Sequence, residues 1–336
     1  MGLPESMRAV QLLDYESRPE SIALARIPVP SPGTGQVLVK MAASPINPSD
    51  LMFVRGLYGF KKPVPAIPGF EGSGTVVASG PGMMARMLRG KRVACAAADP
   101  NIRGGTWAEY LVTSAMFCVP LSKHVDLEHG AMMLVNPLTA WALMKEARRG
   151  RHRAVVQTAA ASALGRMIAR LGKKYSLPVI NVVRRAEQVH LLGESGSQYV
   201  LNSSDADFDG RLRDLCHQLQ ATIGFDAVAG EMSGRILRAQ PGGSRLLVYG
   251  ALSLQAAQVD PASLIFERKT VEGFWLSAWL RSMGMLSQLR VTRQVQSLLS
   301  EDLRSEVHLR VPLEQAAHGL KTYSSEMTAG KVLICP

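Results

Sequence analysis

The spacing of apolar residues changes at about residue 125, and this change constrains the fold more than any other feature of the sequence. Before it, short apolar runs alternate with turn clusters, and we expect strands at 8–13, 36–42, 74–79, 91–96 and 107–112. We expect no helix of any length in this part. The first third is therefore predicted to be β-rich.

Beyond this point, short apolar strands alternate with helical segments. We expect strands at 154–158, 178–183, 199–201, 225–229, 245–250 and 270–274. We expect helices at 136–148, 165–175, 186–192, 210–219 and 234–239. Strands that alternate with helices predict a parallel, doubly wound sheet.

The tail returns to a mixed pattern, with a helix within 285–299, a strand at 307–311, a helix at 313–323 and a last strand at 331–335. The expected fold is therefore α/β, with two domains. A β-rich domain of residues 1–125 and 275–336 is interrupted by a nucleotide-binding-type domain of residues 126–274.

The composition is that of a soluble globular protein, with 47% hydrophobic and 19% charged residues in a chain of 336. No apolar run reaches the roughly 18 residues that a membrane helix needs, so no membrane partner is expected. Residues 1–8 lack the pattern of a secretory signal or a transit peptide, so we expect a cytoplasmic location.

The net charge of +11 favours anionic ligands such as phosphates, coenzyme A or an acidic carrier protein. The basic residues are dispersed, and the densest cluster, at 148–153, contains no aromatic residue. We therefore interpret that cluster as a solvated loop and expect no nucleic-acid partner.

A strand–turn–helix segment at 154–167 has the context of a dinucleotide site. Its glycine pattern is incomplete, because only Gly165 is present and alanines fill the other places. Ala163 adds a methyl group where backbone usually approaches phosphate, and Ser162 could compensate with its hydroxyl. Taken alone, the segment is equally compatible with a plain structural crossover.

The second strand of this part ends in Arg184 and Arg185. An NAD site would have an acidic residue there for the ribose 2′-hydroxyl, whereas guanidinium groups suit a 2′-phosphate. An ordinary basic helix start is the alternative, but the position favours NADPH.

Tyr58 lies in a glycine-flanked loop at 55–59, soon after the run 46–50, with no cluster of metal ligands near it. A tyrosine held by a loop can donate a proton, and beside a hydride donor it could assist reduction of a polarised double bond without zinc. The alternative interpretation of Tyr58 is an aromatic that packs in a cleft wall.

Taken together, these residues resemble the zinc-free branch of the medium-chain dehydrogenase/reductase superfamily. The resemblance is nearest to the enoyl-thioester reductases related to the mitochondrial 2-enoyl reductase, and next to the quinone oxidoreductases. It covers nearly the whole chain and depends on the motifs at 47–50, 56–59, 69–72, 105–107, 136–141, 180–184 and 273–279. It implies a Rossmann doubly wound sheet inserted in a β-rich, GroES-like catalytic domain.

The zinc enzymes of this superfamily carry a cysteine where this chain has Pro45 or Asn47, and a histidine in the place of Phe70. The four-cysteine structural-zinc loop is also absent, since the four cysteines are scattered at 95, 118, 216 and 335. Without thiolate or imidazole ligands at those spacings a tetrahedral zinc site cannot form, so no metal is expected.

By resemblance, Tyr58 matches the tyrosine that assists reduction, and Glu71 is a buried acid with a structural role. The remaining implied residues would all contact the NADPH cofactor. On the pyrophosphate side they are Thr139, Ser162, Ala163, Leu164 and Gly165; at the 2′-phosphate, Arg184 and Arg185; along the cofactor, Tyr249, Gly250 and Ala251; and toward the nicotinamide, Asn47, Phe274, Trp275 and Lys331.

Three functions remain open at this stage, and the first two act on a small-molecule substrate. The first is NADPH-dependent reduction of an activated C=C bond, above all that of a 2-enoyl thioester. The second is NADPH:quinone oxidoreduction, which needs no protein acid. The third is a non-enzymatic nucleotide sensor or scaffold, which the alanine-rich turn at 159–163 favours. The resemblance also implies a homodimer, formed through an edge strand at 245–249 or at 270–274.

Overall fold

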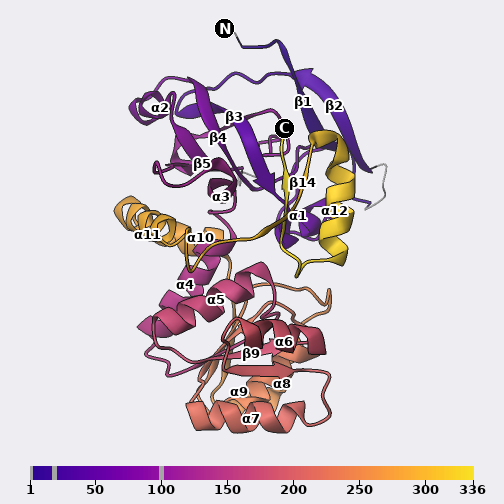
Figure 1. Ribbon diagram of the computed structural model, residues 1–336, viewed down its shortest axis with the longest axis vertical. Coiled ribbons are helices and arrows are strands. Elements are labelled where there is room, and N and C mark those ends of the chain that lie inside the picture. The colour runs from indigo at the N-terminus through magenta and orange to yellow at the C-terminus, as the bar shows by residue number, and fades with distance from the viewer. Residues whose placement is uncertain (1–2, 17–20, 98–101) are drawn as a thin grey trace. The chain divides into compact units, whose positions relative to one another are not determined.

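The computed structural model describes residues 3–16, 21–97 and 102–336 (Figure 1). The first two residues of the N-terminal stretch considered for targeting therefore lie outside the described residues. The chain forms two compact units: unit 1 comprises Met1–Asn136, Gln296–Ser300 and Arg304–Pro336, and unit 2 comprises Pro137–Val295 and Glu301–Leu303. The functional domain limits expected above remain a prediction. In the described part of the chain, no helix is both long and apolar enough to cross a membrane.

Unit 1 is built on a seven-stranded sheet, and the tail contributes two of its strands, as expected. The order is β14 (Val307–Val311), β15 (Lys331–Ile334), β3 (Gln36–Pro45), β4 (Glu71–Ser79), β5 (Arg92–Ala96) and β7 (Cys118–Pro120), with β6 (Tyr110–Ser114) also paired to β3. A separate antiparallel pair is formed by β1 (Ser6–Leu12) and β2 (Ile22–Pro28). Leu333 of β15 pairs with Pro45 at the end of β3, which brings the C-terminal strand beside Asn47.

The expectation that no helix interrupts the first third was wrong. That part contains α1 (Pro48–Val54) and α2 (Met83–Leu88), and unit 1 also includes α3 (Leu127–Ala131) and α12 (Ala316–Ser325) beyond it. Helix α1 begins at Pro48, and the Asp50 carboxylate accepts the backbone N–H of Asn47 at 2.8 Å. A capped helix of seven residues is too short to show a helical period, so its evidence lies in the cap and not in the pattern.

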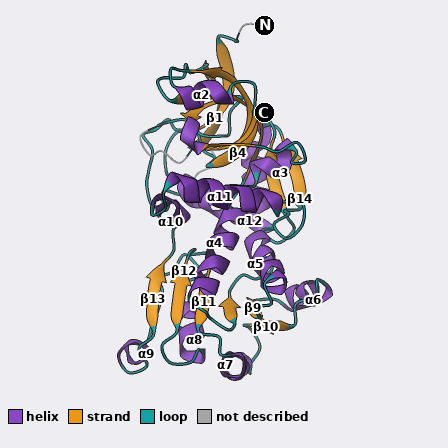
Figure 2. Ribbon diagram, turned by 90° about the vertical axis from the view of Figure 1, so that its left-hand side faces the viewer, coloured by secondary structure: helices purple, strands orange, loops and turns teal. Residues whose placement is uncertain are grey.

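The six-stranded sheet of unit 2 is parallel throughout and confirms the doubly wound fold (Figure 2). Its spatial order is β10 (Tyr199–Asn202), β9 (Val179–Val183), β8 (Val155–Gln157), β11 (Ile223–Asp226), β12 (Arg245–Val248) and β13 (Thr270–Gly273). This is the 3-2-1-4-5-6 order of dinucleotide-binding sheets, which places the topological switch point between β8 and β11.

The helices of this part are α4 (Asn136–Arg149), α5 (Ala163–Lys174), α6 (Ala186–Glu194), α7 (Phe208–Leu219), α8 (Glu231–Ala239), α9 (Pro261–Ile265), α10 (Leu276–Arg281) and α11 (Met285–Ser297). Every residue of β8 and β9 is buried, as is typical of strands covered on both faces. The core between sheet and helices includes Ile180, Phe208, Ile236 and Leu246.

The strand expected at 225–229 begins and ends earlier, at Ile223 and Asp226. The backbone then turns, and Ala229 has a left-handed φ of 62°. Because the strand ends at Asp226, the carboxyl end of β11 presents a carboxylate at the switch point.

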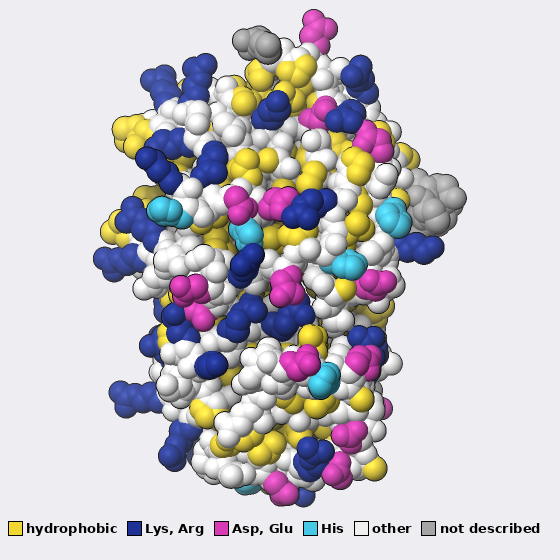
Figure 3. All heavy atoms as spheres, viewed as in Figure 1, with side chains coloured by type: hydrophobic (Ala, Val, Ile, Leu, Met, Phe, Trp, Pro, Cys, Tyr) yellow, Lys and Arg dark blue, Asp and Glu magenta, His cyan; other side chains and the backbone are white. Residues whose placement is uncertain are grey.

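The surface carries basic side chains over much of the face in Figure 3, interspersed with acidic and apolar ones. This distribution agrees with the dispersed arrangement seen in the sequence, in which no long basic run occurs.

Candidate active site

The turn between β8 and α5 retains the one glycine that its geometry requires. A Cβ on Gly165 would lie 2.5 Å from the Ala160 carbonyl oxygen and 2.7 Å from that of Ala159. Ala159 takes a left-handed φ of 49°, a conformation in which glycine is more usual. The alanines therefore fill the turn without removing the close approach of helix to strand.

Ser162 is the N-cap of α5, because its hydroxyl accepts the Gly165 N–H at 3.1 Å. The N–H groups of Ala163 and Leu164, in the first turn, have no acceptor within a helix. A helix N-terminus with such N–H groups favours an anion. Ser162, Ala163, Leu164 and Gly165 lie at this N-terminus, and their role at a pyrophosphate stays a prediction.

Buried polar side chains behind the turn hold it in position. Gln157 donates from Nε2 to the Gly165 carbonyl at 2.9 Å and to Asn181 Oδ1 at 2.7 Å. Asp226 accepts the Thr158 hydroxyl at 2.8 Å and the Ser233 hydroxyl at 2.6 Å. These hydrogen bonds tie β8 to β9 through Gln157 and the end of β8 to β11 through Asp226.

The two arginines after β9 differ in their surroundings. Arg185 pairs with Glu187 at 2.9 Å. The Arg184 side chain is exposed, and in the part of the chain that the structure describes its guanidinium makes no ion pair. The Arg184 backbone is fixed, since its carbonyl accepts the Ser204 hydroxyl at 2.9 Å. Of the pair, Arg184 is therefore the better placed for an external phosphate.

Tyr249, Gly250 and Ala251 follow β12, which ends at Val248, two residues before the end expected for this strand. A Cβ on Gly250 would lie 2.8 Å from the Ala227 carbonyl oxygen, so the loops after β11 and β12 approach closely here. The Tyr249 hydroxyl is buried without a hydrogen-bond partner among the described residues, and burial raises the pKa of Tyr249. An unpaired buried hydroxyl is the kind of group that a bound ligand satisfies.

Phe274 and Trp275 follow the edge strand β13. The Phe274 N–H donates to the Val248 carbonyl at 2.8 Å, and its ring lies against Trp279 with centroids 6.4 Å apart. Trp275 is 42% exposed, and the Arg281 guanidinium lies 5.0 Å over its ring. Thr139 is buried in the first turns of α4.

In unit 1, four buried side chains form one hydrogen-bonded cluster. The Lys331 ammonium donates to Asn47 Oδ1, and Asn47 Nδ2 donates to Glu71 Oε1 at 2.9 Å. The other Glu71 oxygen accepts the N–H groups of Leu134 and Val135, at 2.8 and 2.9 Å. The fourth member is Asp50, which accepts the Asn47 N–H.

Burial changes the proton affinities of this cluster. It lowers the pKa of Lys331 to about 8, although the Glu71 and Asp50 carboxylates oppose the change. It raises the pKa of Asp50 to about 7 and also raises that of Glu71. The three groups interact, so their titrations are coupled. The cluster can therefore gain or lose a proton close to neutral pH.

Tyr58 follows α1 and lies in an aromatic group of unit 1. Its ring centroid is 4.6 Å from that of Phe70 and 5.1 Å from that of Phe60. The side chain is half-buried, so its position is fixed by packing while part of it remains accessible. Asn47 and Lys331 also lie in unit 1, and all other predicted cofactor residues lie in unit 2.

Comparison with known proteins places the chain in a family. Residues 33–123 match the alcohol dehydrogenase GroES-like domain, and residues 163–289 match the family described as zinc-binding dehydrogenase. The mitochondrial enoyl-[acyl-carrier-protein] reductase of Arabidopsis thaliana is 30% identical over 305 residues, which cover 88% of this chain and 80% of that protein. The chain belongs to the medium-chain dehydrogenase/reductase superfamily of oxidoreductases.

Two solved structures of this superfamily are similar along their whole length. A provisionally assigned NADPH:quinone reductase from Mesorhizobium loti is 38% identical, has a TM-score of 0.91 and matches 100% of both chains. A mycobacterial protein complexed with NADPH is 27% identical, with a TM-score of 0.86 over 98% of this chain and 100% of that one.

This superfamily member belongs to the zinc-free branch. At the places of the zinc ligands it carries Pro45 or Asn47, and Phe70, whose side chains do not bind zinc. Asn47 and Phe70 have other roles here, since Asn47 bridges Lys331 and Glu71, and Phe70 packs on Tyr58. The name of the second matched family therefore describes zinc enzymes that share the fold.

Sequence reasoning missed Asp50, Thr158 and Asp226 as members of the site. Asp226 could have been noticed as a lone acid within an apolar strand at the switch point. Asp50 lies three residues after Asn47, at the spacing of a capping box.

Proposed function

We propose that this oxidoreductase uses NADPH to reduce an activated C=C bond, with 2-enoyl thioesters as its substrate class. The observation that carries the proposal is the contact of Tyr58 with Phe70, the residue that stands in the place of a zinc-ligating histidine. The chain thus carries a proton donor beside the position where related enzymes carry a metal ligand. The similarity to an enoyl-[acyl-carrier-protein] reductase over 88% of the chain supports the same substrate class.

The residues of unit 2 fit a phosphorylated dinucleotide. The first N–H groups of α5 would hold the pyrophosphate, and the exposed Arg184 guanidinium would hold the 2′-phosphate. The buried Tyr249 hydroxyl, which has no partner among the described residues, would gain one along the cofactor. Thr139, Gly250, Ala251, Phe274 and Trp275 would complete this surface. Asn47 and Lys331, which the resemblance assigns to the nicotinamide, belong to unit 1.

When bound, NADPH supplies a hydride for the β-carbon of the substrate. As negative charge develops on the thioester oxygen, the Tyr58 hydroxyl donates a hydrogen bond to it or a proton to the α-carbon. An ordinary tyrosine has a pKa of about 10, so its hydroxyl is protonated and able to donate at neutral pH. The aromatic neighbours Phe60 and Phe70 hold the ring in place for this step.

A second candidate function is NADPH:quinone oxidoreduction, which the 38% identical structure from Mesorhizobium loti favours. A reduced quinone can take its protons from water, so Tyr58 would be dispensable for that reaction. We do not retain the third alternative, a non-enzymatic sensor or scaffold, because the relatives are oxidoreductases and the turn keeps Gly165 and its serine cap.

The two reactions can be separated by following NADPH consumption with crotonyl-CoA and with a simple quinone, side by side. The enoyl proposal predicts faster turnover of crotonyl-CoA, and a Tyr58→Phe variant should lower this turnover at least about 10-fold. NADPH affinity should not change in the variant. Turnover of crotonyl-CoA that is unchanged by Tyr58→Phe would remove Tyr58 from the mechanism, and turnover of the quinone alone would select the second function.

We also propose that two copies of the chain pair through the edge strand β13. The alternative strand, at 245–249, is excluded because β12 lies inside the sheet between β11 and β13. Ile265 and Phe266, shortly before β13, are 67% and 80% exposed, and a second copy would cover them. A Phe266→Glu variant should sediment as a monomer at concentrations where the parent is a dimer; a monomeric parent would refute the pairing.

A further inference from the structure

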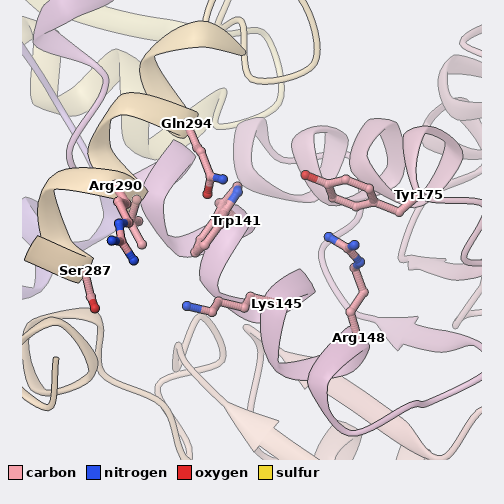
Figure 4. Close-up of a pocket in the computed structure, with 8 residues that line it drawn as sticks. Trp141, Lys145, Arg148, Tyr175, Ser287, Arg290 and Gln294 are labelled. Atoms are coloured by element: carbon pink, nitrogen blue, oxygen red, sulfur yellow. The ribbon is translucent and has the colours of Figure 1, made fainter.

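A basic and aromatic cavity lies within unit 2 and shares no residue with the proposed cofactor site. Its volume is about 330 Å³, at the lower end of the range of small-molecule pockets, roughly 300–1,000 Å³. Its walls come from α4, from the residue that ends α5 and from α11 (Figure 4). Its lining includes Trp141, Lys145, Arg148, Tyr175, Ser287 and Arg290.

Three cations line this cavity and no acidic residue does. In the part of the chain that the structure describes, none of Lys145, Arg148 and Arg290 forms an ion pair. The neighbouring carboxylate on α4, Glu146, accepts the Trp279 indole N–H at 3.1 Å and does not line the cavity. The positive charge of the cavity is therefore not neutralised within it.

Aromatic rings hold two of the cations in place. The Lys145 ammonium lies 5.1 Å from the Trp141 ring centroid and 5.5 Å from that of Trp279. The Arg148 guanidinium lies 4.2 Å over the Tyr175 ring. Ring faces attract cations but carry no net charge, so they orient these groups without compensating them.

The basic side chains of α4 point to two sides of the cavity. Figure 4 shows Lys145 extending from α4 toward the helix that carries Arg290 and Ser287, while Arg148 turns toward Tyr175. Like charges around one small cavity repel one another, and an anion within it would remove that repulsion. Arginine forks and a lysine ammonium match phosphate oxygens, and the Ser287 hydroxyl adds a neutral donor.

We propose that this cavity binds a small anion with two or more phosphoryl groups. Lys145 and Arg290 hold one group from facing helices, and Arg148 holds another on the side of Tyr175. The ligand is either an inorganic polyphosphate or the phosphate chain of a nucleotide, since both present the same chemistry to these cations. The site is separate from the proposed cofactor residues, so the proposal does not depend on the proposed function.

The test is a titration of the full-length chain with inorganic triphosphate, followed by calorimetry and tryptophan fluorescence. We expect saturable binding of one triphosphate per chain, with a fluorescence change that is lost in Trp141→Phe. A Lys145→Ala, Arg290→Ala variant should bind at least about 10-fold more weakly, since each charge-assisted contact contributes about 1.5–3 kcal/mol. Lys145→Arg keeps the charge and should retain binding.

The matched control is an Arg149→Ala, Arg293→Ala variant, which removes the same net charge from the same two helices outside the cavity. It should bind triphosphate like the parent. An equal loss in both double variants would overturn the proposal, because it would show attraction to general positive charge. The proposal would also be overturned if triphosphate binding were retained in the Lys145→Ala, Arg290→Ala variant and lost in Arg184→Ala. That result would place the anion at the proposed cofactor site.

A parallel titration with ATP distinguishes the two sources of the ligand. Equal affinity for ATP and triphosphate supports a site that recognises only the phosphate groups. Tighter binding of ATP, lost in the cavity variant, supports a nucleotide whose base reaches the aromatic wall. Absence of binding by either probe at millimolar concentration would refute the site.

Discussion

The Lys331 ammonium donates a hydrogen bond to Asn47 Oδ1, and this contact joins residues 284 positions apart in the sequence. It links the last strand of unit 1 to the residue that precedes α1. Asn47 in turn donates to Glu71, so a single amide is held between a cation and an anion in the core. With both ends of the amide engaged, the orientation of Asn47 is fixed.

Removing the Lys331 charge should destabilise the protein strongly. Lys331→Met would leave Asp50 and Glu71 buried without their cation, and breaking such a group costs about 3–5 kcal/mol. Urea denaturation measures this loss as a lower free energy of unfolding. Lys321→Met, which removes an exposed lysine from α12, is the control and should change stability by less than about 0.5 kcal/mol. A Lys331→Met, Asp50→Asn double variant should recover part of the stability, and no recovery would contradict the charge argument.

The cluster should make stability depend on pH in a defined direction. The folded pKa of Asp50 is raised to about 7, so between about pH 4 and 7 the folded state binds more protons than the unfolded one. The contribution of Asp50 is therefore favourable at low pH and is lost as the pH rises through 7. Burial lowers the folded pKa of Lys331 to about 8, so below that pH the cost of burying its own charge offsets part of the stabilisation that the ammonium gives the two carboxylates, and this cost disappears as the pH rises toward about 10.

Urea denaturation of the parent and of Asp50→Asn between pH 5 and 8 tests this direction. The free energy of unfolding of the parent should fall relative to that of the variant across this interval, because only the parent ionises residue 50. The effect of Asp50 is complete near pH 7, so this interval samples about two pH units and the expected difference is at most about 3 kcal/mol, which coupling with Glu71 and Lys331 will reduce. If the free energies of unfolding of the two proteins changed in parallel with pH, Asp50 would not titrate between pH 5 and 8.

A methyl group at position 165 should disturb the turn between β8 and α5. In Gly165→Ala the new Cβ would lie 2.5 Å from the backbone oxygen of Ala160, and such overpacking costs about 1–3 kcal/mol. The control is Gly193→Ala in α6, where a Cβ meets nothing within 4 Å and alanine is the better helix former. Thermal unfolding should show a lower midpoint for Gly165→Ala and an unchanged or higher one for Gly193→Ala. Equal midpoints for both variants would mean that the turn adjusts freely.

Local patterns predicted the elements of unit 2 well, because each strand and helix there has its own hydrophobic period. The change in apolar spacing near residue 125 predicted the parallel sheet. The predicted end of the strand now seen as β9 located Arg184 and Arg185 directly after it. The unit 1 cluster and the hydrogen bond from Thr158 to Asp226 join residues that are distant in sequence, 68 positions apart in the second case. The hydrophobic period of the sequence does not predict such contacts, because they depend on which strands lie side by side in the folded protein. The short helix α1 was missed for a related reason, since a cap and not a period defines it.

In the proposed NADPH site, the two arginines after β9 should contribute unequally to the choice between NADPH and NADH. Arg184→Ala removes a guanidinium that has no ion-pair partner among the described residues, and a charge-assisted contact to a 2′-phosphate contributes about 1.5–3 kcal/mol. NADPH affinity should therefore fall at least about 10-fold, while NADH affinity, which involves no 2′-phosphate, stays nearly constant. Fluorescence titration with each cofactor measures both values.

Arg185→Ala is the matched comparison, because it removes the same charge from the next residue. Its guanidinium already pairs with Glu187 at 2.9 Å, so less of its charge is available to a phosphate. We expect a loss of NADPH affinity smaller than that of Arg184→Ala, and Glu187→Ala, which removes this ion pair, should strengthen NADPH binding slightly. If Arg184→Ala lowered the affinities for NADPH and NADH equally, this arginine would support the fold of the turn and would not bind the 2′-phosphate.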